Sequence, residues 1–178
     1  MKVGLVLIGL GLLGMMAHSV AALVVPARFL PDVGLLLVVA VALSVRSPVL
    51  GVLFAVLFGY TTDLLSGTLL GQHVLLRLGV YGVARVVSAR INLRGPLPLA
   101  LFVLILSVIH ACALWALAAF FLPGGVVAPG VLGDLVPHAV ANALLAPVVT
   151  APVAVIARSL GDDDTGRPLR LEPRELLS

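Results

Sequence analysis

Long apolar runs, separated by short breaks that contain proline, glycine or arginine, occupy most of the chain up to Arg158. A helix of about 20 apolar residues crosses the hydrocarbon core of a bilayer. The runs therefore predict an all-α membrane protein with one domain, residues 1–160, in which six transmembrane helices form a bundle. The expected spans are about residues 3–25, 31–46, 48–65, 72–90, 97–122 and 135–157.

Two of these spans have unusual lengths. The first run is longer than the core of a signal peptide, which is about 7–15 residues, so we expect a retained helix even though Lys2 precedes it. The second run, Val33 to Val45, is short. This run can cross the membrane only if it extends from Pro31 to Arg46. The Arg46 side chain would then snorkel to the interface, or the bilayer would be thinner there. The basic stretch Arg85 to Arg94 is expected to form a loop after the fourth span.

Composition excludes a soluble protein. Of the 178 residues, 61% are apolar and 11% are charged, whereas soluble domains contain about 45–50% and about 25%. A soluble enzyme is therefore excluded. The single cysteine, Cys112, excludes an internal disulfide, and a cysteine-based zinc site needs more thiolates. After Arg158 the chain becomes polar, so residues 161–178 are expected to form a disordered tail.

Basic residues predict the orientation of the spans. If both ends are cytoplasmic, nine of the 11 basic residues lie on the inner side and two, Arg28 and Arg77, on the outer side. This imbalance follows the positive-inside rule. The excess of positive charge is thus explained by orientation, and no nucleic acid is expected as a partner. On the inner side, Arg85, Arg90 and Arg94 suit anionic lipid head groups or an acidic partner.

A few polar side chains interrupt the apolar spans and are candidates for function, because such residues are costly in a membrane. They are Arg77 in the fourth span, His110 in the fifth, and His138 and Asn142 in the sixth, where Asp134 is expected as the N-cap. One interpretation is a proton or solute path lined by the histidines, with His18 of the first span. Interhelical hydrogen bonding is favoured instead, because a relay generally needs a carboxylate at mid-depth.

The segment from Gly59 to Gly71 predicts a sharp turn between the third and fourth spans. Asp63 lies where the third span leaves the membrane, and Gly67 and Gly71 follow at a spacing of four residues. The polar backbone of such a turn must be satisfied in or near the interface. Asp63 is expected either to cap exposed amides or to pair with Arg77, and His73 is expected in a solvated loop.

Signals for catalysis, metals or cofactors are weak. The sequence contains no His-Glu-x-x-His metal motif and no Gly-x-Ser-x-Gly nucleophile motif. Cys112 and His110 are two residues apart on one predicted helix and point in different directions. We therefore predict a protein that is not an enzyme and has no cofactor and no metal site.

The pattern resembles the rod shape-determining protein MreD family. The resemblance covers nearly the whole chain through the number and spacing of the spans. The residues that carry it are Pro31-Asp32, Arg46-Ser47-Pro48, Gly59, Asp63, Ser66-Gly67 and Leu70-Gly71.

This resemblance implies a non-enzymatic component of the machinery for lateral cell-wall growth in rod-shaped bacteria. Members lie in the inner membrane with MreC, the actin-like MreB, and the synthase formed by RodA and a penicillin-binding protein. The turn residues named above, together with Pro31 and Asp32, would then form a structural or partner-binding motif.

The family is also similar in fold to the six-helix substrate-binding subunits of energy-coupling vitamin transporters. This similarity supplies an alternative function, a solute-binding subunit of such a transporter. The predicted outer loops lack the cluster of aromatic and polar residues that suits a vitamin, and the one tryptophan, Trp115, lies within the fifth span.

Overall fold

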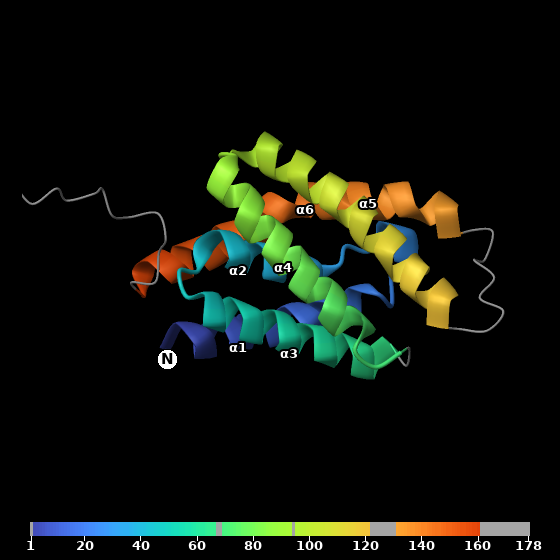
Figure 1. Ribbon diagram of the computed structural model, residues 1–178, viewed down its shortest axis with the longest axis horizontal. Coiled ribbons are helices and arrows are strands. Elements are labelled where there is room, and N and C mark those ends of the chain that lie inside the picture. Colours follow the sequence, from blue (N-terminus) through green and yellow to red (C-terminus); the bar gives the residue numbers. More distant parts are fainter. Residues whose placement is uncertain (1, 67–68, 94, 122–130, 161–178) are drawn as a thin grey trace, which may run out of the picture.

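The computed structural model describes residues 2–66, 69–93, 95–121 and 131–160, which are nearly all helical and contain no strand. Gly67, Arg94 and the predicted tail, 161–178, lie outside the described residues. The elements are α1 (Lys2–Ala21), the short 3-10 helix η1 (Ala27–Phe29), α2 (Val33–Ser44), α3 (Pro48–Ser66), α4 (Gln72–Arg90), α5 (Pro96–Phe121) and α6 (Val131–Ser159), as Figure 1 shows.

Five segments are long and apolar enough to cross a membrane. They are Val3–Ala21, Ala27–Ser44, Pro48–Ser66, Pro96–Phe121 and Gly133–Ser159. The predicted fourth span is not among them, because α4 carries several polar and charged residues. The described residues thus indicate a helical, multi-pass membrane protein.

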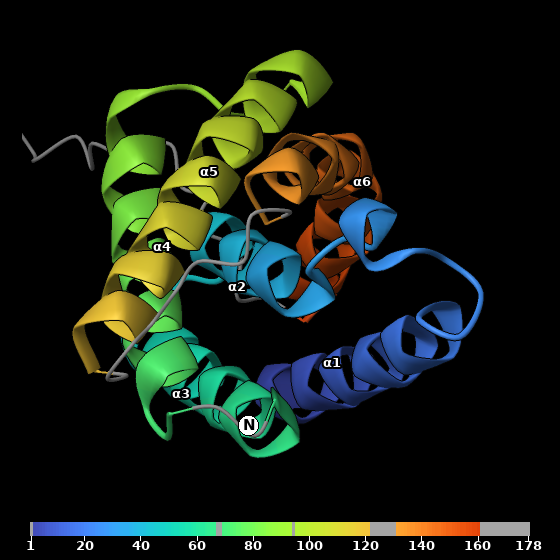
Figure 2. The same cartoon turned by 90° about the vertical axis from the view of Figure 1, so that its right-hand side faces the viewer.

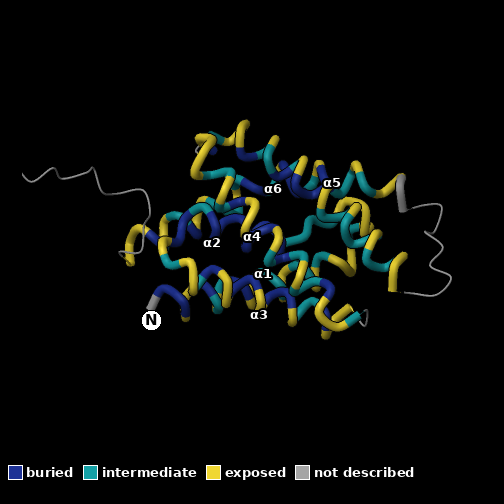
Figure 3. The backbone as a smooth tube through the Cα atoms, in the orientation of Figure 1, coloured by how far each residue is buried: buried dark blue, intermediate teal, exposed yellow. Residues whose placement is uncertain are grey.

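Helix α2 forms the centre of the bundle. It contacts α1, α3, α4 and α6, and Figure 2 shows it between α4 and α5 on one side and α1 and α6 on the other. Ten of its 12 residues are buried, and they make up much of the dark blue core in Figure 3. A helix that is apolar all round is stable here because other helices cover it on all sides.

The outer helices expose large apolar side chains. Leu5 of α1, Leu101 of α5 and Leu144 of α6 are 70%, 57% and 73% exposed. Extended apolar surfaces of this kind are rare on soluble monomers. They fit helices whose outer faces contact lipid or other transmembrane helices.

Three local predictions are wrong. Helix α6 begins at Val131, so Asp134 lies in its first turn and is not the N-cap. Helix α4 ends at Arg90, which confirms the predicted bounds 72–90 for this helix, and the loop expected from Arg85 therefore begins only after Arg90. His73 lies in the first turn of α4, because that helix begins directly after Gly71.

Candidate functional site

An ion pair between the buried Arg77 and the partly exposed Asp32 holds the start of α2. Asp32 is the N-cap of α2, and its carboxylate accepts a hydrogen bond from the Leu35 N–H at 2.9 Å. Arg77 of α4 donates from Nη2 to both oxygens of the Asp32 carboxylate, at 3.0 and 3.3 Å. The same nitrogen donates to Thr62 Oγ1 of α3 at 3.3 Å. Since Arg77 is only 1% exposed, the Asp32 carboxylate compensates a fully buried cation.

Asn142 connects this ion pair to two further helices. Its Oδ1 accepts a hydrogen bond from the Asp32 N–H at 2.7 Å, and its Nδ2 donates to Ser107 Oγ of α5 at 3.1 Å. Asn142 is fully buried in α6. The polar network of Asp32, Thr62, Arg77, Ser107 and Asn142 therefore joins α2 to α3, α4, α5 and α6.

The Arg77 guanidinium also packs directly against the backbone of α2. A Cβ added at Gly34 would lie 2.7 Å from Nη2, so only glycine leaves room there. Within the part of the chain that the structure describes, Nε and Nη1 of Arg77 have no hydrogen-bond partner. Arg77 thus makes its hydrogen bonds through Nη2 alone, and it fits against α2 because Gly34 has no side chain.

The other end of α2 is held by a second arginine of α4. Arg85 donates from Nη1 to the carbonyl oxygens of Ala42 and Val45, at 3.1 and 2.9 Å, and from Nη2 to that of Arg46 at 3.0 Å. The last carbonyl groups of a helix have no partner within the helix, and a cation there complements the helix dipole. Helix α4 thus stabilises both ends of α2.

The corner between α3 and α4 is built on Asp63. The carboxylate of Asp63 accepts hydrogen bonds from the N–H groups of Gly71, His73 and Val74, at 2.9, 2.8 and 3.4 Å. His73 Nδ1 also lies 2.9 Å from Asp63 Oδ1. Of the two predicted roles, capping exposed amides is the one observed. The pairing of Asp63 with Arg77 is wrong, since Asp32 is the partner of Arg77.

The interaction with His73 also corrects the expectation of a solvated histidine. The side chain of His73 is 12% exposed and that of Asp63 is fully buried. A buried carboxylate needs hydrogen-bond donors, and here they are the N–H of the N-cap Gly71, two N–H groups of the first turn of α4 and the His73 ring nitrogen. The histidine is thus part of the corner and not of the surface.

Two glycines of the predicted turn have defined physical roles. Gly71 is in the left-handed region with φ 92°, which side chains other than glycine rarely adopt. A Cβ at Gly59 would lie 2.5 Å from the Val74 Cα, so α3 and α4 approach backbone to backbone at that point. Gly67, the third glycine of the motif, lies outside the described residues.

The predicted intramembrane residues separate into two groups. Arg77 and Asn142 lie in the polar network, whose Asp32 follows the half-buried Pro31. His138 lines an adjacent cavity of about 400 Å³, together with His18, Asp32 and Arg77.

His110 is half-buried on α5 and does not line that cavity. Its Nδ1 has no hydrogen-bond partner among the described residues. Asp134 is exposed at the start of α6. In the described residues, no group of three or more histidine, cysteine or acidic side chains is arranged to hold a metal ion.

Sequence reasoning missed three residues of these contacts. It did not single out Gly34, although a glycine two residues after an aspartate within an apolar run signals close packing. It assigned Arg85 to the loop after the fourth span, although the predicted span 72–90 includes it, and so it did not predict the contact of Arg85 with the end of α2. It also missed Gln72, whose Nε2 donates to the Leu114 carbonyl at 3.0 Å and ties α4 to α5.

Comparisons of the chain with protein families, curated proteins and solved structures gave no match.

Proposed function

We propose that this chain is a non-enzymatic membrane scaffold of the MreD type, which regulates cell shape and lateral peptidoglycan synthesis through association with MreC. Through MreC it would act on MreB and on the synthase of RodA and a penicillin-binding protein. The proposal includes six spans in the bacterial inner membrane, with both termini cytoplasmic. It rests on the resemblance of the sequence and on the way the polar side chains of the bundle are used.

The observation that carries the scaffold function is the polar network around Asp32 and Arg77. Five helices contribute to it, and the bonds between its members join α2 to α4 and α6, α4 to α3, and α6 to α5. Side chains that are occupied in this way stabilise one arrangement of the helices. A fixed arrangement presents a constant outer surface, which is what a partner protein in the membrane requires.

The sixth span of the proposal depends on α4. Its 19 residues correspond to about 28 Å, close to the thickness of the hydrocarbon core. Two of its arginines lower its hydropathy, but Arg77 is buried on Asp32 and Arg85 is bonded to the end of α2. Charged side chains in spans usually face the bundle interior and are paired there, so these arginines are compatible with a spanning helix.

Topology mapping tests the six spans. Reporters or single cysteines placed after residues 28, 70, 92, 127 and 165 should report outside, outside, inside, outside and inside. The arrangement follows from the distribution of basic residues. An outside signal at residue 92 would contradict it, because α4 would then not cross.

Co-purification tests the partners. The tagged chain, extracted from native membranes in a mild detergent, should carry MreC and the synthase components with it. Recovery with Gly59→Ala should fall, because α3 and α4 cannot then approach as they do. The matched control is Gly79→Ala in α4, where an added Cβ meets nothing within 4 Å. Recovery of MreC that is equal for both variants and the unaltered chain would contradict a role for the α3–α4 corner.

Complementation tests the biological role and the absence of turnover. A deletion strain should have rounded or widened cells, and the intact chain should restore rod shape. Alanine variants of His18, His110 and His138 should also restore it, because the histidines lie outside the polar network. If His110→Ala abolished rod shape while the protein remained abundant and bound to MreC, a proton- or ligand-linked mechanism would replace the scaffold.

One observation favours the second candidate, a solute-binding subunit of an energy-coupling transporter. The cavity of about 400 Å³ is lined by a buried arginine, a carboxylate and two histidines, and small-molecule sites commonly have this size and a few polar groups. The same co-purification separates the two functions. A paired ATPase module in place of MreC would support the transporter.

A further inference from the structure

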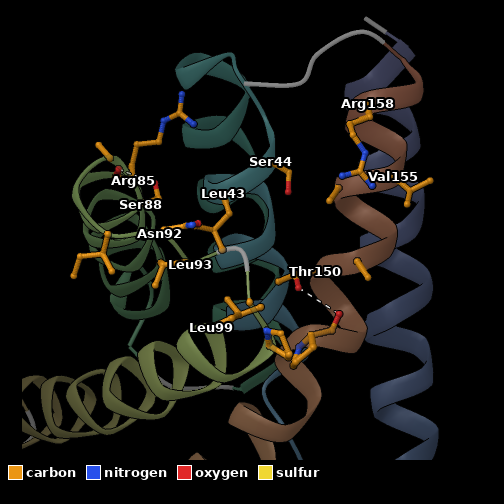
Figure 4. Close-up of a pocket in the computed structure, with 17 residues that line it drawn as sticks. Leu43, Ser44, Arg85, Ser88, Asn92, Leu93, Leu99, Thr150, Val155 and Arg158 are labelled. Carbon is orange, nitrogen blue, oxygen red and sulfur yellow. Dashed lines mark hydrogen bonds between the residues drawn. The ribbon is translucent and has the colours of Figure 1, made fainter. Parts of the chain in front are cut away.

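A second cavity among the described residues lies at the opposite end of α2 from the polar network. It has a volume of about 860 Å³ and is formed by the ends of α2, α4 and α6 and the start of α5 (Figure 4). In the proposed orientation, this end of the bundle is the cytoplasmic one. Neither the scaffold function nor the second candidate assigns anything to this cavity.

Among the described residues, the two charged side chains that line the cavity are cations. Arg85 and Arg158 line it, and none of the residues that line it is acidic. The Arg85 guanidinium is bonded to the end of α2. The Arg158 guanidinium makes no hydrogen bond to any residue that the structure describes, and in Figure 4 it extends from α6 toward Ser44 of α2. Arg158 is thus the donor that a ligand in the cavity would meet.

The polar wall continues with small hydrogen-bonding side chains. Ser44, Ser88, Asn92 and Thr150 line the cavity beside the two arginines. The hydroxyls of Ser88 and Thr150 donate to carbonyl oxygens one turn earlier in their own helices, which leaves their lone pairs as acceptors. This wall matches a ligand that has an anionic group followed by hydroxyl groups, which can donate to these oxygens.

The remaining wall is apolar and reaches the outer surface of the bundle. Leu43, Leu99, Ala151 and Ala154 belong to it, and of these Leu99 is buried. At its rim, Ile91 and Val155 are 56% and 54% exposed. The cavity therefore connects a cationic wall with the surface that faces the acyl chains of the membrane.

We propose that this cavity binds one anionic phospholipid, with its phosphate on Arg158 and its acyl chains leaving past Val155. Basic cavities between transmembrane helices on the cytoplasmic side are typical sites for anionic head groups. A free phosphate would fill only a small part of the volume, whereas ligands of several functional groups occupy cavities of about 300–1,000 Å³. The guanidinium is also the side chain that best matches the geometry of a phosphate.

A different role for Arg158 is complementing the dipole at the end of α6, where it is the basic residue of the last turn. Arg90 is the matched control for that role. It is the basic residue in the last turn of α4 and is exposed, but it does not line the cavity. If Arg158 binds the lipid, its substitution should weaken lipid binding more than the substitution of Arg90 does. If only the total positive charge matters, the two substitutions should weaken binding equally.

The test is lipid binding by the full chain, delipidated in an uncharged detergent and measured by native mass spectrometry. Phosphatidylglycerol should bind more tightly than phosphatidylcholine with the same acyl chains. Arg158→Gln should weaken phosphatidylglycerol binding by about tenfold or more, because a charge-assisted hydrogen bond is lost. Arg90→Gln should leave it within about twofold, and Arg158→Lys should restore part of the affinity.

Two further measurements locate the site and show whether the bound phosphate belongs to a lipid. Ala154→Leu should weaken phosphatidylglycerol binding by filling the cavity while it retains both arginines, with folding checked by gel filtration. Glycerol 3-phosphate and inorganic phosphate should not compete. The proposal is overturned if Arg158→Gln and Arg90→Gln have equal effects, if phosphatidylcholine binds as tightly, or if the soluble phosphates displace the lipid.

Discussion

Helices α2 and α5 have similar apolar sequences but opposite environments. Ten of the 12 residues of α2 are buried, whereas α5 has 26 residues and buries Leu99, Val103, Leu106 and Ser107. Helix α2 is about 18 Å long, shorter than the hydrocarbon core, and α5 is about 39 Å long. Helix α2 is therefore covered by protein along most of its length, and both of its ends are bonded to side chains of the bundle.

The difference shows what places a helix at the centre of a membrane bundle. Lipid is as apolar as leucine, so apolar side chains alone do not favour the interior. The orphan amides and carbonyls at the ends of α2 do require partners inside the protein. Asp32 and Arg85 supply them, and Arg77 compensates the carboxylate.

The largest effect should come from removing the cation at the start of α2. Arg77→Leu leaves the Asp32 charge without its partner and should lower the free energy of unfolding by about 3–5 kcal/mol. The measurement is loss of helicity on titration with a denaturing detergent. Arg90→Leu, at an exposed position, is the control. Adding Asp32→Asn should recover part of the loss, and a double variant that loses the full sum would contradict the pairing.

The second prediction compares the same substitution, leucine to alanine, in α2 and in α5. Leu36→Ala in α2 opens a cavity at a fully buried position. It should lower the free energy of unfolding by an amount near the lower end of about 2–5 kcal/mol, because in a membrane the truncated side chain is not transferred from water. Leu101→Ala in α5 is 57% exposed and should change stability little. The same unfolding titration measures both. If both variants lost equal unfolding free energy, α5 would be covered by other helices as α2 is.

A smaller effect is expected at the other end of α2. Arg85→Gln removes bonds to the carbonyls of Ala42, Val45 and Arg46 and should cost about 1–3 kcal/mol, the penalty for unsatisfied buried polar groups. Amide hydrogen exchange should increase in the last turn of α2 and not in α5. Exchange that stays unchanged in α2, or unfolding that matches Arg90→Gln, would show that this end needs no cap.

The smallest effect should come from the side chain that ties α5 to the network. Ser107→Ala removes the bond from Asn142 and should cost about 0.6 kcal/mol, the average for such bonds in a membrane protein. Cys112→Ala, at an exposed position of the same helix, is the control. If the free energy of unfolding fell by more than about 2 kcal/mol, polar contacts would hold α5 in place as they hold α2.

The helical class, the bounds of several helices and the polar residues that interrupt them could all be predicted from the sequence. Apolar length and breaks such as Arg46-Ser47-Pro48 act locally, so α3 and α5 begin and end within about two residues of the predicted bounds. The corner at Asp63 was also predictable in part, because a carboxylate between a helix and Gly71 is a local capping arrangement.

Which polar groups meet could not be predicted, because it depends on how the helices pack. Asp32 and Arg77 are 45 residues apart, and Asp32 and Asn142 are 110 apart, and no local spacing relates them. Asp63 lies closer to Arg77 in the chain but is occupied by the amides of its own turn. The central position of α2 is likewise a tertiary result, because its apolar residues suit lipid and protein equally, and the partners of its ends come from α4.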